Sequence, residues 1–389
     1  MRKILTILFL AMLALGICSA CAEEEELLWE EEEILLEDVL PTPEEVEVVP
    51  EGETVYAGPA DYHEADGTVL ITLTATGDFT IGGDSRKKAD IFNDELKRQD
   101  GDINFTMRNM REILMSDDLT LVNFEGTLTD SKYVPSNKKN NQFLFSAPPS
   151  YVSMLTDNGI EAVALENNHI MDHGEQAYED TKQTLRDAGI VYSNSTEVGV
   201  IEIKGVKIAM LTYLCIDRYQ QLWDKVPEDI RAAKAEYPIV IVSFHWGNEK
   251  DYKPTENQKR MGRLAVDSGA DLVLGHHSHR MNPIECYNGV YICYSLGNFC
   301  FSGNSKPSDM NSFVFQTRFR VVEGEAGESD TITNEGFRII PIRISSRKDR
   351  NDFIPTVLTE HTAVDSVVST LKSNGRDLDY AVEDYPLEW

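Results

Sequence analysis

The sequence predicts an α/β fold built mainly on parallel strands. From Val69 onward, short apolar runs of strand length alternate with longer amphipathic stretches, which is the order of a parallel sheet with crossover helices. In addition, almost every polar cluster follows directly on a predicted strand, as at the ligand-binding edge of an open α/β sheet. A content of 41% apolar residues is typical of globular proteins, and 389 residues suffice for one large domain with a tail at each end or for two modest domains.

Each predicted element is bounded by a change from apolar to polar or turn-forming residues. The predicted strands are 70–75, 120–123, 162–165, 206–212, 239–244, 272–274 and 290–295. The predicted helices are 105–115, 149–158, 175–188 and 257–268, with a last helix near 363–371. After Phe301, apolar and polar residues alternate over 312–322 and 336–344, which predicts strands that close a second sheet.

The first 22 residues have the order of a bacterial signal segment. A cationic start at Arg2 and Lys3 precedes an apolar run over 4–17, and small residues then lead to Cys21, which four glutamates follow. This order predicts a lipoprotein start with Cys21 as the lipidation site, with plain secretion or an uncleaved anchor as alternatives. The apolar run is short beside the roughly 20 residues of a membrane span. We therefore expect a protein outside the cytoplasm, either anchored to the cell membrane by lipid or secreted.

Residues 23–66 are predicted to form an acidic flexible tether. The stretch 22–53 holds 15 acidic residues and no basic ones, which is half of the formal net charge of −30, and self-repulsion extends such a segment. A chain this negative repels phosphate backbones, so nucleic-acid binding through a basic patch is excluded. The expected organisation is a signal segment (1–22), the tether, a main domain (67–347), and a C-terminal extension (348–389) with a helix that packs on the domain.

The four cysteines of the predicted domain are not expected to form disulfides. Asn288-Gly289 predicts a two-residue hairpin turn, in which Cys286 faces Tyr291 and Cys293 lies one diagonal step away. That diagonal separation is roughly 7–8 Å, which is too long for a disulfide. The sequence therefore predicts buried thiols.

Five polar clusters follow predicted strands, namely 76–78, 123–126, 166–169, 244–249 and 275–279. Because the carboxyl ends of parallel strands meet at one edge of a sheet, we expect these clusters to lie together. Five of the eight histidines fall in them, and His, Asp, Glu and Asn donors suit Mn²⁺, Fe²⁺ or Zn²⁺. His277 and His279 are two residues apart, so in an extended segment they point to the same side and can serve one ion or two neighbouring ions.

Each cluster taken singly also has a structural interpretation. Gly77-Asp78 is a common turn, and Asn168 before His169 could cap an ordinary helix. His245 could be a half-buried histidine, and the histidine run after residue 275 could lie on the surface. Five coincidences at strand ends nevertheless favour a common metal site.

Together these motifs resemble a known family. The series GD, NFEG, NNHxxDHG, HWGxE, GHHSH and YSLGNFCF resembles the poly-γ-glutamate capsule-biosynthesis (CapA-type) proteins, which are relatives of the calcineurin-like metallophosphoesterases. The resemblance covers roughly residues 69–301. It implies a four-layer αββα sandwich with a metal centre between the carboxyl ends of two sheets, and a role in the biosynthesis of a cell-surface polymer.

The resemblance also implies roles for individual residues. The implied metal ligands are Asp78 and His279 for a first ion, Asn168, His245 and His277 for a second ion, and Glu125 as the bridging acid, with Asn123 as its rival. His169 matches the position that protonates a leaving group. Two divalent ions in such a centre clamp and activate a bridging water. The chain departs from the phosphoesterase motif Asp-x-His, because Thr80 stands at the histidine position, so a weakly held first ion, or none, is also open.

Several residues are candidates for binding a substrate. Trp246 and Glu249, together with Asn123, are candidates for substrate binding, with a structural role of the loop as the alternative for the first two. Lys138 and Lys139 could attract an anionic polymer or could simply be solvated.

The sequence leaves two functions open. One hypothesis is a metal-dependent hydrolase acting on an ester or amide bond of a cell-surface polymer or its precursor. The other is a non-catalytic, tethered accessory that helps assemble or export an anionic polymer with membrane polymer-synthase subunits.

Overall fold

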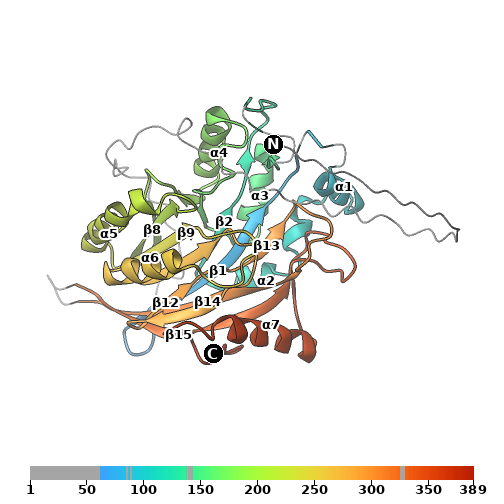
Figure 1. Ribbon diagram of the computed structural model, residues 1–389. Coiled ribbons are helices and arrows are strands. Elements are labelled where there is room, and N and C mark those ends of the chain that lie inside the picture. Colours follow the sequence, from blue (N-terminus) through green and yellow to red (C-terminus); the bar gives the residue numbers. More distant parts are fainter. Residues whose placement is uncertain (1–61, 85, 88–89, 137, 139–142, 325–328) are drawn as a thin grey trace, which may run out of the picture. The chain divides into compact units, whose positions relative to one another are not determined.

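We describe the protein from a computed structural model, shown in Figure 1. The structure describes residues 62–84, 86–87, 90–136, 138, 143–324 and 329–389. The predicted signal segment, its lipidation site Cys21 and nearly all of the predicted tether lie outside these residues. Within the described part of the chain, no helix is both long enough and apolar enough to cross a membrane.

Two mixed β-sheets form the centre of the fold (Figure 1). The larger sheet has the order β16-β15-β14-β1-β2-β5-β6, with β13 also paired to β1, and the smaller has the order β11-β12-β10-β9-β8-β7. The strands of the larger sheet are β1 (Val69–Thr80), β2 (Leu119–Phe124), β5 (Ala162–Ala164), β6 (Val191–Ser193), β13 (Asn298–Phe301), β14 (Asn311–Val322), β15 (Thr331–Arg343) and β16 (Thr356–Val357). Those of the smaller sheet are β7 (Gly199–Ile203), β8 (Val206–Leu214), β9 (Ile239–His245), β10 (Leu272–His276), β11 (Ile284–Tyr287) and β12 (Val290–Cys293); β3 (Thr127–Leu128) and β4 (Ser146–Ala147) form a separate pair.

Helices α1 to α6 cover the outer faces of the two sheets, whereas α7 packs against the core between them. The helices are α1 (Ile91–Arg98), α2 (Arg111–Leu114), α3 (Ser153–Thr156), α4 (Glu175–Asp187), α5 (Tyr219–Glu236), α6 (Glu256–Asp267) and α7 (His361–Asn374), with 3₁₀ turns η1 (Ile103–Met107) and η2 (Pro149–Val152). Three apolar cores separate the layers. One lies between the sheets, one joins the larger sheet to α1–α4, and one joins the smaller sheet to α5 and α6. The predicted α/β class and four-layer αββα sandwich are confirmed.

Alternation along the strands, with one irregularity in β1, explains how the layers form. In β1, Leu73 and Ala75 enter the core between the sheets. Phe79 is an even number of residues further on but enters the core under the helices, because the register of β1 shifts between Ala75 and Phe79. All seven residues of β9 are buried, as expected for a parallel strand covered on both faces. Parallel pairing of β1 with β2, and of β9 with β10, places Asp78 opposite Asn123 and His245 opposite His276. This register sets the position of the polar clusters.

The late strands correct one prediction. Strands β14 and β15 do not close a second sheet, because β14 pairs antiparallel with β1 and extends the first one. Their inner face carries Phe315 and Phe337, which pack in the core between the sheets together with Val367 and Leu371 of α7. Helix α7 therefore runs along β14 and β15, as Figure 1 shows, and belongs to the core of the fold.

Two helical predictions also differ from the structure, and helices α1 and α5 lie outside all the predicted helices. The predicted helices 105–115 and 149–158 are each a 3₁₀ turn followed by a four-residue α-helix. Helix α5, with 18 residues, was not predicted. It contains Pro227, which removes one backbone donor and argues against a helix in the sequence, but its buried face packs on the smaller sheet.

The predicted hairpin register is confirmed. Cys286 faces Tyr291 across β11 and β12, and the four cysteines among the described residues are free. Cys215, Cys293 and Cys300 are buried, as predicted, whereas Cys286 is only half-buried.

Candidate metal centre

The acidic half of the centre comes from the larger sheet. Asp78 lies near the end of β1, and Asn123 lies opposite it on β2, two residues before Glu125. The Asn123 amide donates to Asp78 Oδ1 at 2.9 Å and to Glu125 Oε1 at 3.2 Å. Thr80 Oγ1 donates to Glu125 Oε2 at 3.2 Å. All four side chains are buried, so two carboxylates are held close together away from water.

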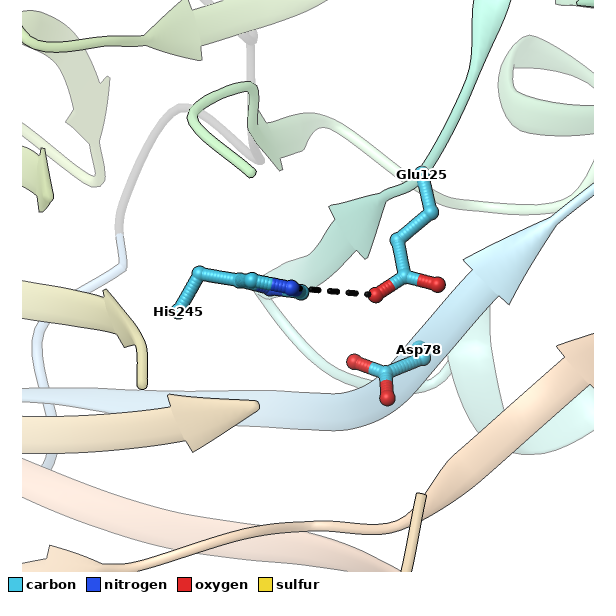
Figure 2. Close-up of side chains that lie close together, drawn as sticks. All are labelled: Asp78, Glu125 and His245. Atoms are coloured by element: carbon cyan, nitrogen blue, oxygen red, sulfur yellow. Dashed lines mark ion pairs between the residues drawn. The ribbon is translucent and has the colours of Figure 1, made fainter. Parts of the chain in front are cut away.

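The imidazoles come from the smaller sheet. Figure 2 shows His245, at the end of β9, and the carboxylates of Asp78 and Glu125 turned toward one another. His245 Nε2 lies 3.6 Å from Glu125 Oε1 and 2.9 Å from Asn168 Oδ1, and the His277 ring is 4.7 Å from the His245 ring. Ligand atoms of Asp78, Glu125 and His245 all lie within 4.8 Å of one another. The residues predicted for the second ion therefore gather around His245, which also contacts Glu125.

The histidines after β10 complete the other side. His279 Nδ1 lies 3.0 Å from Asp78 Oδ2 and 2.9 Å from Asn298 Oδ1, and His276 Nδ1 lies 3.4 Å from Asp78 Oδ1. His277 and His279 have φ values of 91° and 53°, a backbone region that is strained for these residues and is typical of functional loops. The sequence predicted His277 and His279 but missed His276, although the GHHSH motif contains this third histidine.

The centre contains polar atoms that the described part of the chain leaves without a hydrogen-bond partner. They are Asp78 Oδ2, Asn123 Oδ1, both ring nitrogens of His276, and Nδ1 of His277. Each such buried atom costs about 1–3 kcal/mol unless something satisfies it. Five of them in one place, all acceptors or nitrogen donors suited to Mn²⁺, Fe²⁺ or Zn²⁺, fit a bound divalent metal.

The electrostatics of the carboxylates also fit a cation. Burial and the charge of Asp78 raise the pKa of Glu125 to about 7. Burial also acts to raise the pKa of Asp78, but the imidazoles of His276 and His279 hold it well below its usual range. Two acids this close resist carrying charge together, and an added cation relieves this repulsion.

The histidines divide into charged and neutral groups. Burial lowers the pKa of His279, but Asp78 and Glu125 outweigh it and raise that pKa to about 10. Burial and the charge on His279 lower the pKa of His277 to about 4, and burial with His277 holds the pKa of His245 well below its usual range. His245 and His277 are therefore neutral at pH 7, which is the protonation state that binds metal.

His169 sits beside the centre in a fixed orientation. Its Nδ1 lies 2.8 Å from Asp172 Oδ2, and Asp172 also accepts from Lys138 Nζ at 3.0 Å and from the Phe145 amide at 2.9 Å. Burial opposes protonation of His169, but Asp172, with help from Glu125, raises its pKa. The Asp172 contact leaves Nε2 of His169 as the available nitrogen. No role was predicted for Asp172, although it lies in the NNHxxDHG motif.

The loop after β9 carries two residues that were predicted to bind substrate, Trp246 and Glu249, and the prediction for Trp246 is wrong. Trp246 does not line a substrate pocket, because it is fully buried in the core with the outer helices, stacked 4.5 Å from Phe244, and its Nε1 donates to Tyr294 O at 2.8 Å. Glu249 is exposed, and its charge acts on His277 and on His279.

Of the two lysines after the Glu125 motif, Lys138 and Lys139, the structure describes only the first. Lys138 is paired with Asp172, so it is not simply solvated. Lys139 lies outside the described residues.

The comparisons with known proteins assign the family. Residues 72–303, well over half of the chain, match the family described as "Bacterial capsule synthesis protein PGA_cap". The chain belongs to this family. The resemblance drawn from the motifs is therefore confirmed, and every residue of the centre described above lies inside the matched segment.

Three relatives within the capsule-synthesis group show the extent of the similarity. The chain is 34% identical over 209 residues to the PGA biosynthesis protein CapA of Bacillus subtilis (strain 168), covering 49% of this chain and 54% of the relative. It is 28% identical over 256 residues to the capsule biosynthesis protein CapA of Bacillus anthracis, covering 59% and 60%. It is 28% identical over 214 residues to a probable polyglutamine synthesis accessory protein of Mycobacterium tuberculosis (strain ATCC 25618 / H37Rv), covering 46% and 55%. The chain thus spans a little over half the length of these relatives.

Proposed function

We propose that the protein serves the biosynthesis of a cell-surface polymer of the poly-γ-glutamate type, as a metal-dependent hydrolase of an ester or amide bond in the polymer or its precursor. The observation that carries this proposal is the joining of a buried donor set with an oriented acid, His169 held by Asp172. Membership of the capsule-synthesis family and the names of the relatives support the polymer. We further propose that the acidic segment tethers the domain outside the cell through lipidated Cys21.

The residues of the centre divide naturally into places for two ions. Asn168, His245 and His277 would hold one ion, and Asp78 with His279 the other, with Glu125 between them. When bound, such ions supply a Lewis acid and lower the pKa of a bound water. The identity of the metal, Mn²⁺, Fe²⁺ or Zn²⁺, follows only from the donor types.

The protein's own groups perform the proton transfer and positioning. Asp172 accepts a hydrogen bond from Nδ1–H of His169. This bond directs Nε2 to the leaving atom and stabilises the protonated imidazole, which donates a proton to that atom. Lys138 and the Phe145 amide hold the Asp172 carboxylate in place. Burial of the carboxylates keeps bulk water from competing with the substrate.

A non-catalytic role is the second candidate. Thr80 replaces the first-motif histidine and donates to Glu125, so the Asp78 ion has fewer motif ligands. The name of the mycobacterial relative also describes an accessory protein. In this role the tethered domain would help membrane polymer-synthase subunits assemble or export an anionic polymer.

One set of experiments separates the two candidates. The purified chain, loaded with Mn²⁺ or Zn²⁺, is assayed on bis(p-nitrophenyl) phosphate and on poly-γ-glutamate, beside His169→Ala and the matched control His173→Ala. Metal-dependent turnover that His169→Ala reduces at least about 100-fold, while the control keeps it, supports the hydrolase. Full activity in His169→Ala, or no turnover in the loaded wild type, overturns it. In the second case, lower polymer yield from cells lacking the gene would support the accessory role.

A further inference from the structure

We propose that His276 is a further ligand of the ion at Asp78 and supplies the imidazole that Thr80 does not. This inference rests on the metal centre of the proposed function. His276 lies outside the ligand set that the motifs imply, which contains only His277 and His279 from the GHHSH segment.

The position of His276 in the smaller sheet directs its side chain toward the acids. It is the last residue of β10 and pairs in register with His245, the last residue of β9. Paired residues of neighbouring strands present their side chains on the same face of a sheet. His245 faces Glu125, and His276 accordingly reaches Asp78, with 3.4 Å between its Nδ1 and Asp78 Oδ1.

The surroundings of His276 leave its ring nitrogens unused. The side chain is fully buried, and neither nitrogen has a hydrogen-bond partner in the part of the chain that is described. Burial of a polar ring without partners is unfavourable unless a ligand satisfies it. Two donors bound tetrahedrally to one ion at about 2.0–2.2 Å lie about 3.3–3.6 Å apart, and the 3.4 Å between His276 Nδ1 and Asp78 Oδ1 is within this range.

The other side of Asp78 supplies the remaining donors. His279 Nδ1 is 3.0 Å from Asp78 Oδ2, and Glu125 is the bridging acid of the proposed function, whereas Asn123 turns its NH2 group, and not its oxygen, toward both acids. Thr80 contributes nothing, since its hydroxyl donates to Glu125. With His276, the Asp78 ion has two carboxylates, from Asp78 and the bridging Glu125, and two imidazoles, which is enough for a four-coordinate site. Without His276, it has three donors.

The test measures metal binding directly. The full chain is stripped of metal, and its affinity for Zn²⁺ and Mn²⁺ is measured by calorimetry, with ions per chain counted by elemental analysis. The variants are His276→Phe, which keeps a planar ring and removes the donors, and His173→Phe as the control, because it makes the same increase in size at a buried histidine that lies outside the ligand set. We expect His276→Phe to weaken the binding of one ion at least tenfold and His173→Phe to bind as wild type does.

Equal binding by wild type and His276→Phe overturns the inference and leaves the metal centre standing. No metal binding by wild type overturns both. A second measurement does not depend on any variant: anomalous diffraction from wild-type crystals soaked in Mn²⁺ or Zn²⁺. An ion within about 2.4 Å of a His276 ring nitrogen supports ligation, whereas an ion more than 3 Å from both nitrogens overturns it.

Discussion

Both ends of the central strands carry buried acidic side chains, but the hydrogen-bond partners of these acids differ between the two ends. At the amino ends, Asp118 accepts from the Thr72 amide at 2.8 Å and from Lys204 Nζ at 2.9 Å, and Glu161 accepts from the Thr120 amide at 2.8 Å. At the carboxyl ends, Asp78 Oδ2 lies 3.0 Å from His279 Nδ1 as an ion pair, but it and both ring nitrogens of His276 have no hydrogen-bond partner within the described residues. The chain itself satisfies the acids at one end, whereas polar atoms at the other end are left available for a ligand.

This difference separates structural acids from functional ones. Burial and charge alone do not, because acids at both ends have pKa values raised by burial. The discriminating property is the set of partners, which is complete at one end and open at the other. Four substitutions test this difference between the two ends of the strands.

The largest effect is expected for His245→Ala at the carboxyl ends. His245 lies close to both Glu125 and Asn168, so its loss removes the imidazole that contacts these two residues. We expect metal affinity to fall by about 100-fold or more and metal-dependent turnover to be lost. Elemental analysis after dialysis measures the first effect. Asp118→Asn at the amino ends is the matched control, and a loss of metal in that variant would contradict the contrast.

A smaller effect on rate is expected for Asp172→Asn. The amide cannot hold His169 in its protonated, oriented form, so kcat/KM should fall by about 10²–10⁴-fold while metal content stays at the wild-type level. The loss should be larger for substrates with poor leaving groups than for p-nitrophenyl esters, because only the former need a proton. A uniform loss on both substrates would indicate a merely structural role.

At the amino ends, Asp117→Asn should stabilise the protein. Burial, with Glu161 and Asp118, raises the pKa of Asp117 from 3.8 to about 7. Between these values the unfolded chain loses the proton that the native chain keeps, so this group lowers stability as pH rises through this window, and the full loss is present above pH 7.

Asparagine cannot ionise, so the variant should escape that loss. We expect it to exceed wild type by roughly 1–3 kcal/mol at pH 8 and by little at pH 4. Urea unfolding of metal-free protein at both pH values measures the difference. The same pH dependence in variant and wild type would show that Asp117 ionises freely in the folded state.

The smallest effect is expected for Glu249→Gln at the rim. Glu249 is exposed, and solvent screens its interaction with His277 and His279. Metal affinity should therefore change less than about threefold. Calorimetric titration beside His245→Ala gives the comparison, and a change near that of His245→Ala would place Glu249 among the ligands.

Local patterns in the sequence determined the α/β class and the residues that gather at the site. Six residues lie at the end of an apolar strand or just after one, and parallel strands bring such ends together whatever the details of packing. They are Asp78, Glu125, Asn168, His245, His277 and His279. The β11–β12 register followed from Asn288-Gly289, because a two-residue turn dictates which residues face each other.

Only the tertiary structure decided the roles that depend on distant partners. It turned Trp246 into the core with Tyr294, joined Asp172 to Lys138 across 34 positions, and attached β14 to β1. It also left His276 beside Asp78 without a hydrogen-bond partner among the residues described. Strand period and turn chemistry are local, so sequence reveals them, whereas the partner of a buried polar atom comes from remote segments and is known only once they pack.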